Sequence, residues 1–359
     1  MFPWDTLSDA AAVAREHGDG IVDLSVGTPV DPVAPVIREA LAAASAAPGY
    51  PTTAGTPALR ESIVHALQRR HSITGLDADA VLPVIGTKEF IAWLPTLLGL
   101  GAPDAVVVPE LAYPTYEVGA LLAGARVLRA DSLTQLGPGS PSLLYLNSPS
   151  NPTGKVLGVE HLRKVVEWAR QRGVLVASDE CYLGLGWDQA PLSILHPQVC
   201  DGDHTGLLAV HSLSKTSSLA GYRAGFVAGD PEVVAELLTV RKHAGMMVPA
   251  PVQAAMVAAL DDDEHQQAQR ERYARRRAAL LPALRSAGFT VELSEAGLYL
   301  WATRDEPCRD SVGWLAQRGI LVAPGEFYGP RGGRHVRVAL TATDERIAAA
   351  VARLADPAR

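Results

Sequence analysis

The sequence is poor in cysteine and carries no excess of basic residues. Its three cysteines, Cys181, Cys200 and Cys308, form no C-x-x-C pair, which argues against a disulfide framework or a zinc cluster and fits a reducing cytoplasm. The formal net charge of −7 argues against nucleic acid as a partner, because phosphate binding requires an excess of lysine and arginine. The ten histidines show neither H-x-H nor H-E-x-x-H spacing, so we expect no metal site.

Long hydrophobic runs are also missing from the chain. The most apolar stretch, residues 90–100, is too short to cross a bilayer and contains Pro95. The N-terminus has neither a basic start nor an apolar run, so we expect no signal peptide, a cytoplasmic location and no membrane partner. A hydrophobic content of 48% with 20% charged residues is typical of a globular protein, and 359 residues favour two domains.

Short apolar runs alternate with helical patterns between about residue 80 and residue 230. We expect an α/β fold, because nearly continuous apolar strands indicate a mostly parallel sheet buried between two layers of helices. The predicted strands are 81–85, 105–108, 125–128, 143–146, 174–177, 207–211 and 224–228, and the predicted helices are 87–100, 114–123 and 159–172.

The remainder of the chain has a different pattern. Residues 251–287 are predicted to be mostly helical, and short strands then mix with helices, which indicates a smaller α+β domain. We therefore expect a large domain at 30–250 and a small domain at 251–359, with an N-terminal segment at 1–29 that packs on the small domain.

One lysine lies between small hydroxyl residues in a turn framed by glycine. The run from Ser212 to Gly225 reads SLSKTSSLAGYRAG and contains Lys215 and Arg223. Lysine forms a Schiff base with an aldehyde cofactor, and arginine binds a phosphate through two parallel hydrogen bonds. A surface loop with a stray lysine would have the same composition, so the rest of the chain has to supply the cofactor site.

Two further segments place polar residues after buried strands. Residues 174–182 read VLVASDECY, with Asp179 at the strand end and Tyr182 close behind. A buried carboxylate there would keep a pyridine nitrogen protonated, although a lone aspartate could equally cap the next element. Residues 145–154 read YLNSPSNPTG, in which Asn151 opens a turn that ordinary turn chemistry also explains.

In this order and at these intervals, the segments resemble the class I and II aminotransferases, fold type I enzymes that use pyridoxal 5′-phosphate. The resemblance implies that Lys215 anchors the cofactor and then moves a proton. It implies that Asp179 faces the ring nitrogen, while Asn151 and Tyr182 contact the phenolic oxygen. The remaining cofactor contacts would be a phosphate site formed by Thr87, Lys88, Ser212 and Arg223, and an aromatic stack from Tyr113.

The resemblance also covers the substrate and a partner subunit. Gly27, in LSVGTP, and Arg337, in the apolar run HVRVAL, would hold the substrate α-carboxylate together with Asn151. A charged residue in such a run is costly to bury unless it pairs with a protein acid or a ligand acid. Tyr50, in GYPTTAGTPALR, would reach the phosphate of a neighbouring subunit, which implies a homodimer with shared active sites.

Segments such as FPWDTL, VDLSVGTPVDPV and SDECYLGLGWD are similar to actinobacterial succinyldiaminopimelate aminotransferases of lysine biosynthesis. This similarity implies transfer of an amino group from L-glutamate to N-succinyl-2-amino-6-oxopimelate. Lys88, Arg331 and Arg334 are candidates for contact with a distal carboxylate, and a solvated surface charge is an equally good interpretation of each. An aminotransferase for another amino acid, or a C–S lyase of the same fold, would share the cofactor residues.

Two other features receive simpler interpretations. The basic run 275–277 lies among acids and is expected to be a solvated helix face rather than a nucleic-acid patch. The acidic run 261–264 is expected to favour a helix start through the helix dipole. A transcription regulator with a DNA-binding module before the same domain is not expected, because the LSVGTP segment begins at Leu24.

Overall fold

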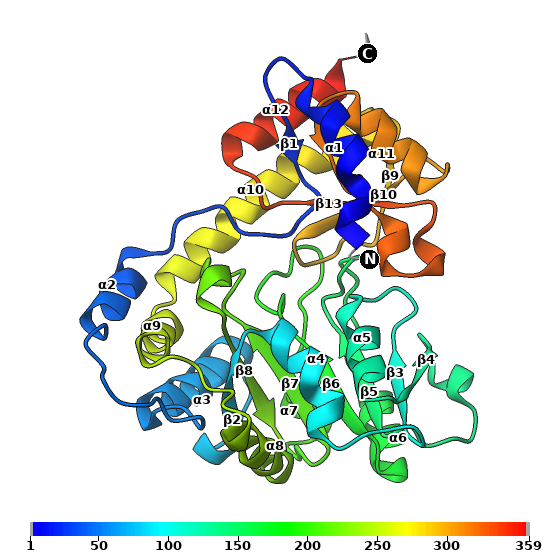
Figure 1. Cartoon of the computed structure of the whole chain (residues 1–359). Helices are drawn as coiled ribbons and strands as arrows, with labels where there is room; N and C mark the ends of the chain where they lie inside the picture. The colour runs from blue at the N-terminus through cyan, green and yellow to red at the C-terminus, as the bar shows by residue number, and fades with distance from the viewer. Residues whose placement is uncertain (1–2, 357–359) are drawn as a thin grey trace.

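The computed structural model describes residues 3–356 and contains a seven-stranded sheet covered by helices on both faces (Figure 1). The strand order is β2-β8-β7-β6-β5-β3-β4, and β8 is antiparallel to both of its neighbours while the other strands pair in parallel. The α/β class is therefore confirmed. The strands are β2 (Val81–Ile85), β3 (Ala105–Val108), β4 (Arg126–Arg129), β5 (Leu143–Asn147), β6 (Leu175–Asp179), β7 (Leu207–Ser212) and β8 (Ala224–Gly229).

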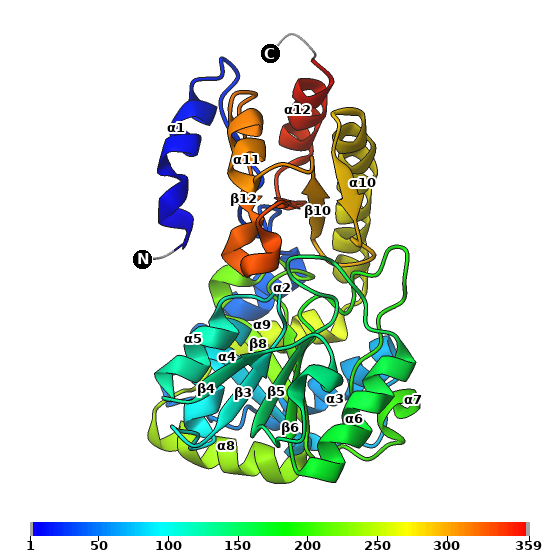
Figure 2. The same ribbon diagram turned by 90° about the vertical axis from the view of Figure 1, so that its right-hand side faces the viewer.

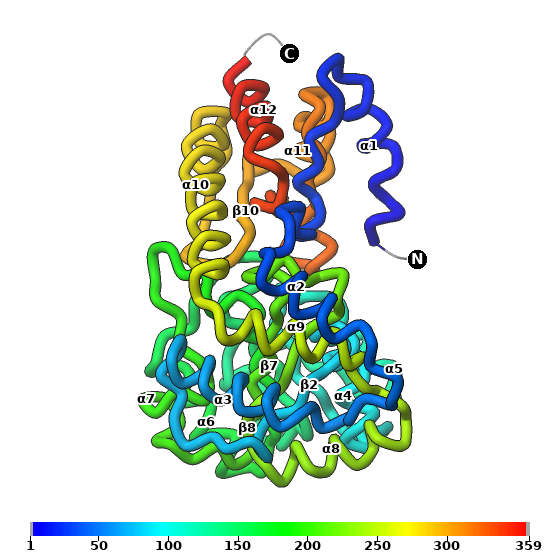
Figure 3. The backbone as a smooth tube through the Cα atoms, turned by 90° about the vertical axis from the view of Figure 1, so that its left-hand side faces the viewer, coloured from blue at the N-terminus to red at the C-terminus, as the bar shows by residue number. Residues whose placement is uncertain are grey.

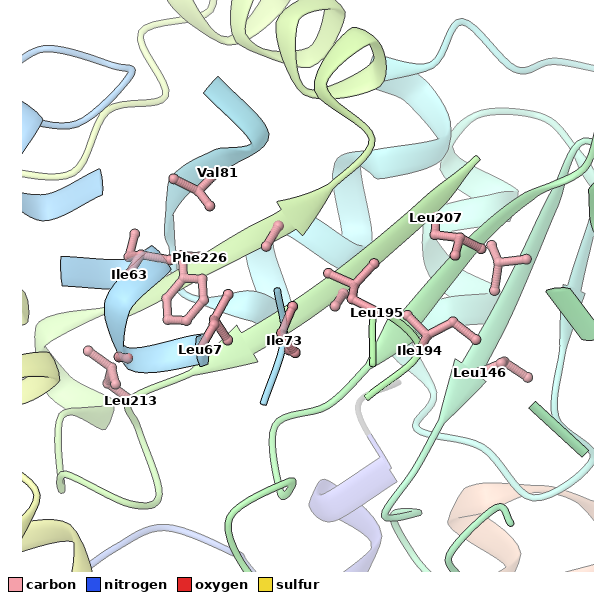
Figure 4. Close-up of a cluster of buried hydrophobic side chains, with 14 of the residues drawn as sticks. Ile63, Leu67, Ile73, Val81, Leu146, Ile194, Leu195, Leu207, Leu213 and Phe226 are labelled. Carbon is pink, nitrogen blue, oxygen red and sulfur yellow. The ribbon is translucent and has the colours of Figure 1, made fainter. Parts of the chain in front are cut away.

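Each face of this sheet has its own hydrophobic core. Figure 4 shows part of one core, where Ile63 and Leu67 of α3 pack with Phe226 of β8. On the other face, α4, α5 and α8 bury a second set of side chains against alternate residues of the same strands. The first face is covered by α2 (Pro35–Ala43), α3 (Pro57–His71), α6 (Val159–Arg172), α7 (Pro197–Cys200) and α9 (Ala250–Asp261), and the second by α4 (Thr87–Leu97), α5 (Thr115–Leu122) and α8 (Pro231–His243).

Burial on both faces explains why the sequence located these strands well, since neither face needs polar residues. The expected helix at 87–100 is shorter and ends at Leu97, and Gly99 takes a left-handed conformation just beyond it. Strands β5, β6 and β7 run one or two residues beyond their expected ends. Their last residues are Asn147, Asp179 and Ser212, so polar side chains gather at one edge of the sheet.

A smaller antiparallel sheet, ordered β12-β13-β10-β9, lies above this edge (Figure 2). The N-terminal segment packs beside this sheet without joining it: β1 pairs in parallel with β11 in a separate two-stranded sheet, and α1 packs beside α11. Residues 1–2 and 357–359 of the predicted domains lie outside the described residues. The elements of the N-terminal segment and of the part around the small sheet are the short 3-10 turn η1 (Pro3–Leu7), α1 (Ser8–Arg15), β1 (Val22–Asp23), α10 (Glu264–Ser286), β9 (Thr290–Glu292), β10 (Tyr299–Thr303), α11 (Cys308–Ala316), β11 (Ile320–Leu321), β12 (Ala323–Pro324), β13 (Val336–Ala339) and α12 (Asp344–Ala355).

Helix α10 runs from the large sheet to the small one (Figure 3). It contains the basic run 275–277, which was expected to be a solvated helix face, and this expectation is wrong for one residue. Arg276 on this helix is buried instead of solvated. Its guanidinium contacts Asp31 of the N-terminal connector at 2.6 Å and Asp344 of α12 at 2.6 Å. The two carboxylates offset the cost of burying the guanidinium, and the ion pairs link α10 to the N-terminal connector and to α12. Between residues 3 and 356, no helix combines the length and apolar character needed to span a membrane.

Candidate active site

A cavity of about 680 Å³ lies where the carboxyl ends of the large-sheet strands face the small sheet. Side chains from both sheets, from the N-terminal segment and from the first turn of α4 line it. Tyr50 is absent from the cavity and is 99% exposed on the surface. The predicted site residues that do line it are Gly27, Thr87, Lys88, Tyr113, Asn151, Asp179, Tyr182, Ser212, Lys215, Arg223 and Arg337.

One end of the cavity is a cradle for an anion. Gly86 ends the connection from β2 to α4 with φ +76°, and it is followed by the first turn of α4, whose N–H groups make no hydrogen bonds within the helix. A Cβ atom at Gly86 would lie 2.2 Å from Nη2 of Arg223, so any other residue would displace the guanidinium from this position. Ser212 adds a hydroxyl from the end of β7. A guanidinium above a helix N-terminus fits a phosphate group.

A buried carboxylate lies deeper in the cavity. Asp179 is 6% exposed, and its Oδ2 accepts a hydrogen bond of 2.7 Å from the Tyr116 hydroxyl. The backbone N–H of Cys181 donates to its Oδ1 at 3.2 Å. Burial raises the pKa of Asp179, and within residues 3–356 this carboxylate has no ion pair. A buried carboxylate of this kind needs a cationic partner from a ligand, and a protonated pyridine nitrogen would serve.

The turn after β5 is fixed by a side chain that the sequence analysis did not select. Asn147 donates from Nδ2 to the carbonyl of Asp179 at 3.0 Å, while its Oδ1 accepts from the backbone N–H of Asn151 at 2.7 Å. One amide therefore positions Asn151 relative to the end of β6. This position of Asn147 at the last residue of the strand is the signal that could have revealed it.

The amine of Lys215 lies where the cavity meets the N-terminal segment. Its Nζ donates a hydrogen bond to the carbonyl of Gly27, and its own carbonyl accepts from the Tyr273 hydroxyl at 3.1 Å. A Cβ atom at Gly27 would lie 2.1 Å from the Tyr299 hydroxyl, so the close approach of Tyr299 requires glycine. Lys215 is therefore part of the cavity wall, and its amine contacts the loop of the N-terminal segment that contains Gly27.

Arg337 is a buried cation without a carboxylate partner among the described residues. It is 3% exposed and donates to Oδ1 of Asn151 at 2.9 Å and to the carbonyl of Ser25 at 2.7 Å. Its guanidinium carbon lies 3.9 Å from the centre of the Tyr299 ring. Its Nε has no hydrogen-bond partner within the described part of the chain. Since an unpaired buried charge is strongly unfavourable, the site calls for an anionic ligand.

Two tyrosines also contribute to the site, and the sequence analysis missed both: Tyr299 of β10 lines the cavity, and Tyr116 of α5 contacts Asp179 from behind the lining. The hydroxyl of Tyr299 lies 3.1 Å from that of Tyr182. Burial opposes ionisation of Tyr299, but the cations of Arg337 and Lys215 outweigh it and lower its pKa. Tyr116 lies in α5 and Tyr113 precedes this helix; their rings pack edge to face with centroids 6.0 Å apart, so helical spacing in the sequence does not mark the pair.

Arg331 and Arg334 do not line the cavity, which favours the second of their two interpretations, a solvated surface charge. Arg331 pairs with Glu110 at 2.7 Å, and Arg334 pairs with Asp305 at 2.7 Å. Both are surface ion pairs between protein groups. Lys88 is the one of the three candidates that lines the cavity.

Known proteins are similar to this chain over nearly its whole length. Residues 19–354 match the family described as aminotransferase class I and II. A probable aminotransferase of Mycobacterium tuberculosis is 82% identical over 99% of this chain and 85% of its own length. The 4-dedimethylamino-4-oxo-anhydrotetracycline transaminase of Streptomyces rimosus is 59% identical over 98% of both chains. The structure of a probable N-succinyldiaminopimelate aminotransferase from Thermus thermophilus superposes with a TM-score of 0.88 at 29% identity, over 98% of each chain.

Proposed function

The chain belongs to the class I and II aminotransferases, which depend on pyridoxal 5′-phosphate, and we propose that it moves an amino group from L-glutamate to a keto acid. One observation carries this proposal: an amine, a buried carboxylate and a buried guanidinium that forms no ion pair with any described residue line the same cavity. These groups are Lys215, Asp179 and Arg337.

The cavity fits the cofactor at each end. The cradle of Gly86 and Arg223 suits the phosphate, with Thr87, Lys88 and Ser212 around it. When bound, pyridoxal phosphate acts as an electron sink for negative charge that develops at the substrate Cα. The buried carboxylate of Asp179 would keep the ring nitrogen protonated, because none of the described residues forms an ion pair with it.

The chain's own groups then orient the substrate and move its proton. Arg337 grips the α-carboxylate, and Asn151 orients the guanidinium through their hydrogen bond. Lys215 would hold the cofactor, and its amine would act as the general base for the proton at the substrate Cα. We assign Tyr182 and Asn151 to the phenolic oxygen and Tyr113 to the face of the ring. These roles are supported by the residues' positions in one cavity.

We further propose N-succinyl-2-amino-6-oxopimelate as the acceptor. Beyond the cofactor residues, the cavity wall is apolar at Trp4, Ile91 and Val118, and Lys88 supplies a cation. An aliphatic chain with a terminal carboxylate is complementary to such a wall. The Thermus thermophilus structure and an LL-diaminopimelate aminotransferase of Gloeobacter violaceus, 35% identical over 96% of this chain, support related substrates.

A bulky cyclic ketone is a second candidate acceptor. The Streptomyces rimosus relative, which is 59% identical, is named for such a substrate. The apolar wall that contains Trp4 and the size of the cavity favour it. A half-reaction screen separates the candidates: the cofactor-loaded protein is mixed with single amino donors, and conversion of the cofactor to its amine form is followed by absorbance. Conversion by N-succinyl-LL-diaminopimelate and glutamate is expected, whereas pyruvate release from cystathionine would instead indicate a C–S lyase.

We also propose a homodimer with shared active sites. Large apolar side chains are exposed on α4, on α5 and on the loop before α3, namely Trp93, Leu121, Leu122 and Tyr50. A second copy of the chain would cover them and place Tyr50 near the partner's phosphate cradle. Sedimentation should give the mass of two chains. Tyr50→Phe should weaken cofactor binding without changing that mass, and a monomeric, active protein would refute this proposal.

A further inference from the structure

Glu180 and His211 form a buried polar pair at the ends of β6 and β7. They lie on the face opposite to the one that carries Asp179 and Ser212. Asp179 pairs in register with Val210, and the backbone N–H of Glu180 donates to the carbonyl of Val210 at 2.9 Å. Because side chains alternate along a strand, Glu180 and His211 point away from the face that carries Asp179 and Ser212. The pair is therefore one residue from a cofactor residue on each strand.

The two side chains meet in the interior. Glu180 is 2% exposed and His211 is 6% exposed, and Oε2 of Glu180 lies 3.5 Å from Nε2 of His211. Neither of these two atoms has a hydrogen-bond partner among residues 3–356. The other carboxyl oxygen of Glu180 accepts from the backbone N–H of Ile194 at 2.7 Å. Two buried polar atoms without partners, held face to face, need one proton between them.

The surroundings supply no charge that would stabilise an ionised pair, as far as the described residues show. The ring of His211 stacks on Phe226 of β8 at 5.1 Å and on His71 of α3 at 6.3 Å. A second, smaller cavity lies beside Glu180 and His211. Arg70 of α3 also lines it, but its guanidinium pairs with Asp263 at 2.6 Å. The remaining titratable neighbours are Asp179 and Cys181, which flank Glu180 in the chain.

Burial shifts the pKa values of Glu180 and His211 so that both side chains favour their neutral forms. It raises the pKa of Glu180 to about 7, although hydrogen bonds from Ser193, Ile194 and Ser178 act in the opposite direction, and the charge of Asp179 adds a smaller upward effect. It lowers the pKa of His211 to about 3 and that of His71 to about 4. A carboxylic acid that donates to a neutral imidazole satisfies both groups without a buried charge.

We propose that Glu180 and His211 share one proton, donated by the carboxylic acid to Nε2 of the imidazole, and that this neutral pair positions the cofactor site. The pair ties β6 to β7 next to Asp179 and Ser212, which bind opposite ends of the cofactor. It also leaves the charge of Asp179 without competition from a second anion on Glu180. The positioning role rests on the proposed function, whereas the shared proton does not.

The first test measures thermal stability of the cofactor-free protein against pH. The folded-state pKa of Glu180 is raised, so its contribution to stability is present below about pH 4.5 and is lost as the pH rises towards about 7. Glu180→Gln keeps both hydrogen bonds but carries no titrating group. The melting temperature of Glu180→Gln minus that of the wild type should therefore increase as the pH rises from about 5 to about 8. The exposed Glu236→Gln serves as control, and a pH-independent difference for Glu180→Gln would overturn the shared proton.

The second test observes His211 directly by ¹⁵N NMR of histidine-labelled, cofactor-free protein. The signal is assigned by its loss in His211→Asn. A neutral ring whose Nε2 only accepts a hydrogen bond is expected at about pH 6. An imidazolium signal would overturn the proposal, because the pair would then be an ion pair.

The third test concerns the positioning role and measures affinity for pyridoxal phosphate by absorbance titration. His211→Leu leaves the Glu180 acid without its acceptor, and we expect roughly tenfold weaker binding. Glu180→Gln retains the link between the strands and should bind within about twofold of the wild type. Equal affinities in all three proteins would refute the positioning role. If even the wild type fails to bind the cofactor, the proposed function fails while the first two tests still decide the shared proton.

Discussion

The hydroxyl of Tyr116 donates a hydrogen bond of 2.7 Å to the carboxylate of Asp179, and both groups are buried. Tyr116 also stacks on Tyr145, whose own hydroxyl donates to the carbonyl of Ile91. The carboxylate that is proposed to hold the cofactor's ring proton is therefore oriented by a helix on one face of the sheet. Hydrogen bonding from Tyr116 lowers the pKa of Asp179 against the larger opposing effect of burial.

Tyr116→Phe should consequently raise the pKa of Asp179 and weaken its hold on the ring proton. We expect kcat/KM for glutamate to fall roughly tenfold, the equivalent of one hydrogen bond to a charged group. Tyr145→Phe is the matched control, because it removes a buried tyrosine hydroxyl that does not touch Asp179. Equal losses in the two variants would show that packing, and not the bond to Asp179, is responsible.

The anion cradle depends on the missing side chain of Gly86. Gly86→Ala places a Cβ atom 2.2 Å from the Arg223 guanidinium, so the dissociation constant of pyridoxal phosphate should rise at least about tenfold. Gly124→Ala is a fitting control, since Gly124 has the same φ of +76° but no described atom within 4 Å of an added Cβ. Cofactor affinity that falls equally in both would point to backbone strain alone.

Arg337 should be essential for recognising the α-carboxylate. Arg337→Lys keeps the charge but loses the two-pronged geometry, so kcat/KM for glutamate should fall roughly a hundredfold. Cofactor binding should change little, because Arg337 lies at the substrate end of the cavity. Stopped-flow kinetics of the glutamate half-reaction give both quantities. A variant with unchanged kinetics would remove Arg337 from the substrate site.

Two buried arginines should respond in opposite ways when they are replaced by methionine. Arg276→Met breaks a buried bridge to Asp31 and Asp344 and should destabilise the protein by roughly 3 kcal/mol. Arg337→Met removes a buried charge without a carboxylate partner among the described residues and should leave stability unchanged or raised. Urea unfolding of the cofactor-free variants measures both. A destabilised Arg337→Met protein would mean that Arg337 has a structural role.

Much of the fold follows from the sequence because both faces of the large sheet are apolar, so the strands at 81–85 and 105–108 have the predicted limits. The cavity residues Asp179 and Lys215 could be selected because they follow such strands within recognisable motifs. Tyr299 and Arg276 could not, since each acquires its role only when distant segments pack together. Arg276 lies among charges typical of an exposed helix, and nothing local in the sequence reveals Asp31 beside it.

The central claim is that Lys215 anchors the cofactor, and covalent labelling tests it most directly. The protein loaded with pyridoxal phosphate is reduced with borohydride, digested and mapped by mass spectrometry. Lys88 lines the same cavity and provides an internal comparison. The account predicts a single modified peptide that carries the cofactor on Lys215 and is lost in Lys215→Ala. Modification of Lys88 instead, or no modification at all, would contradict it.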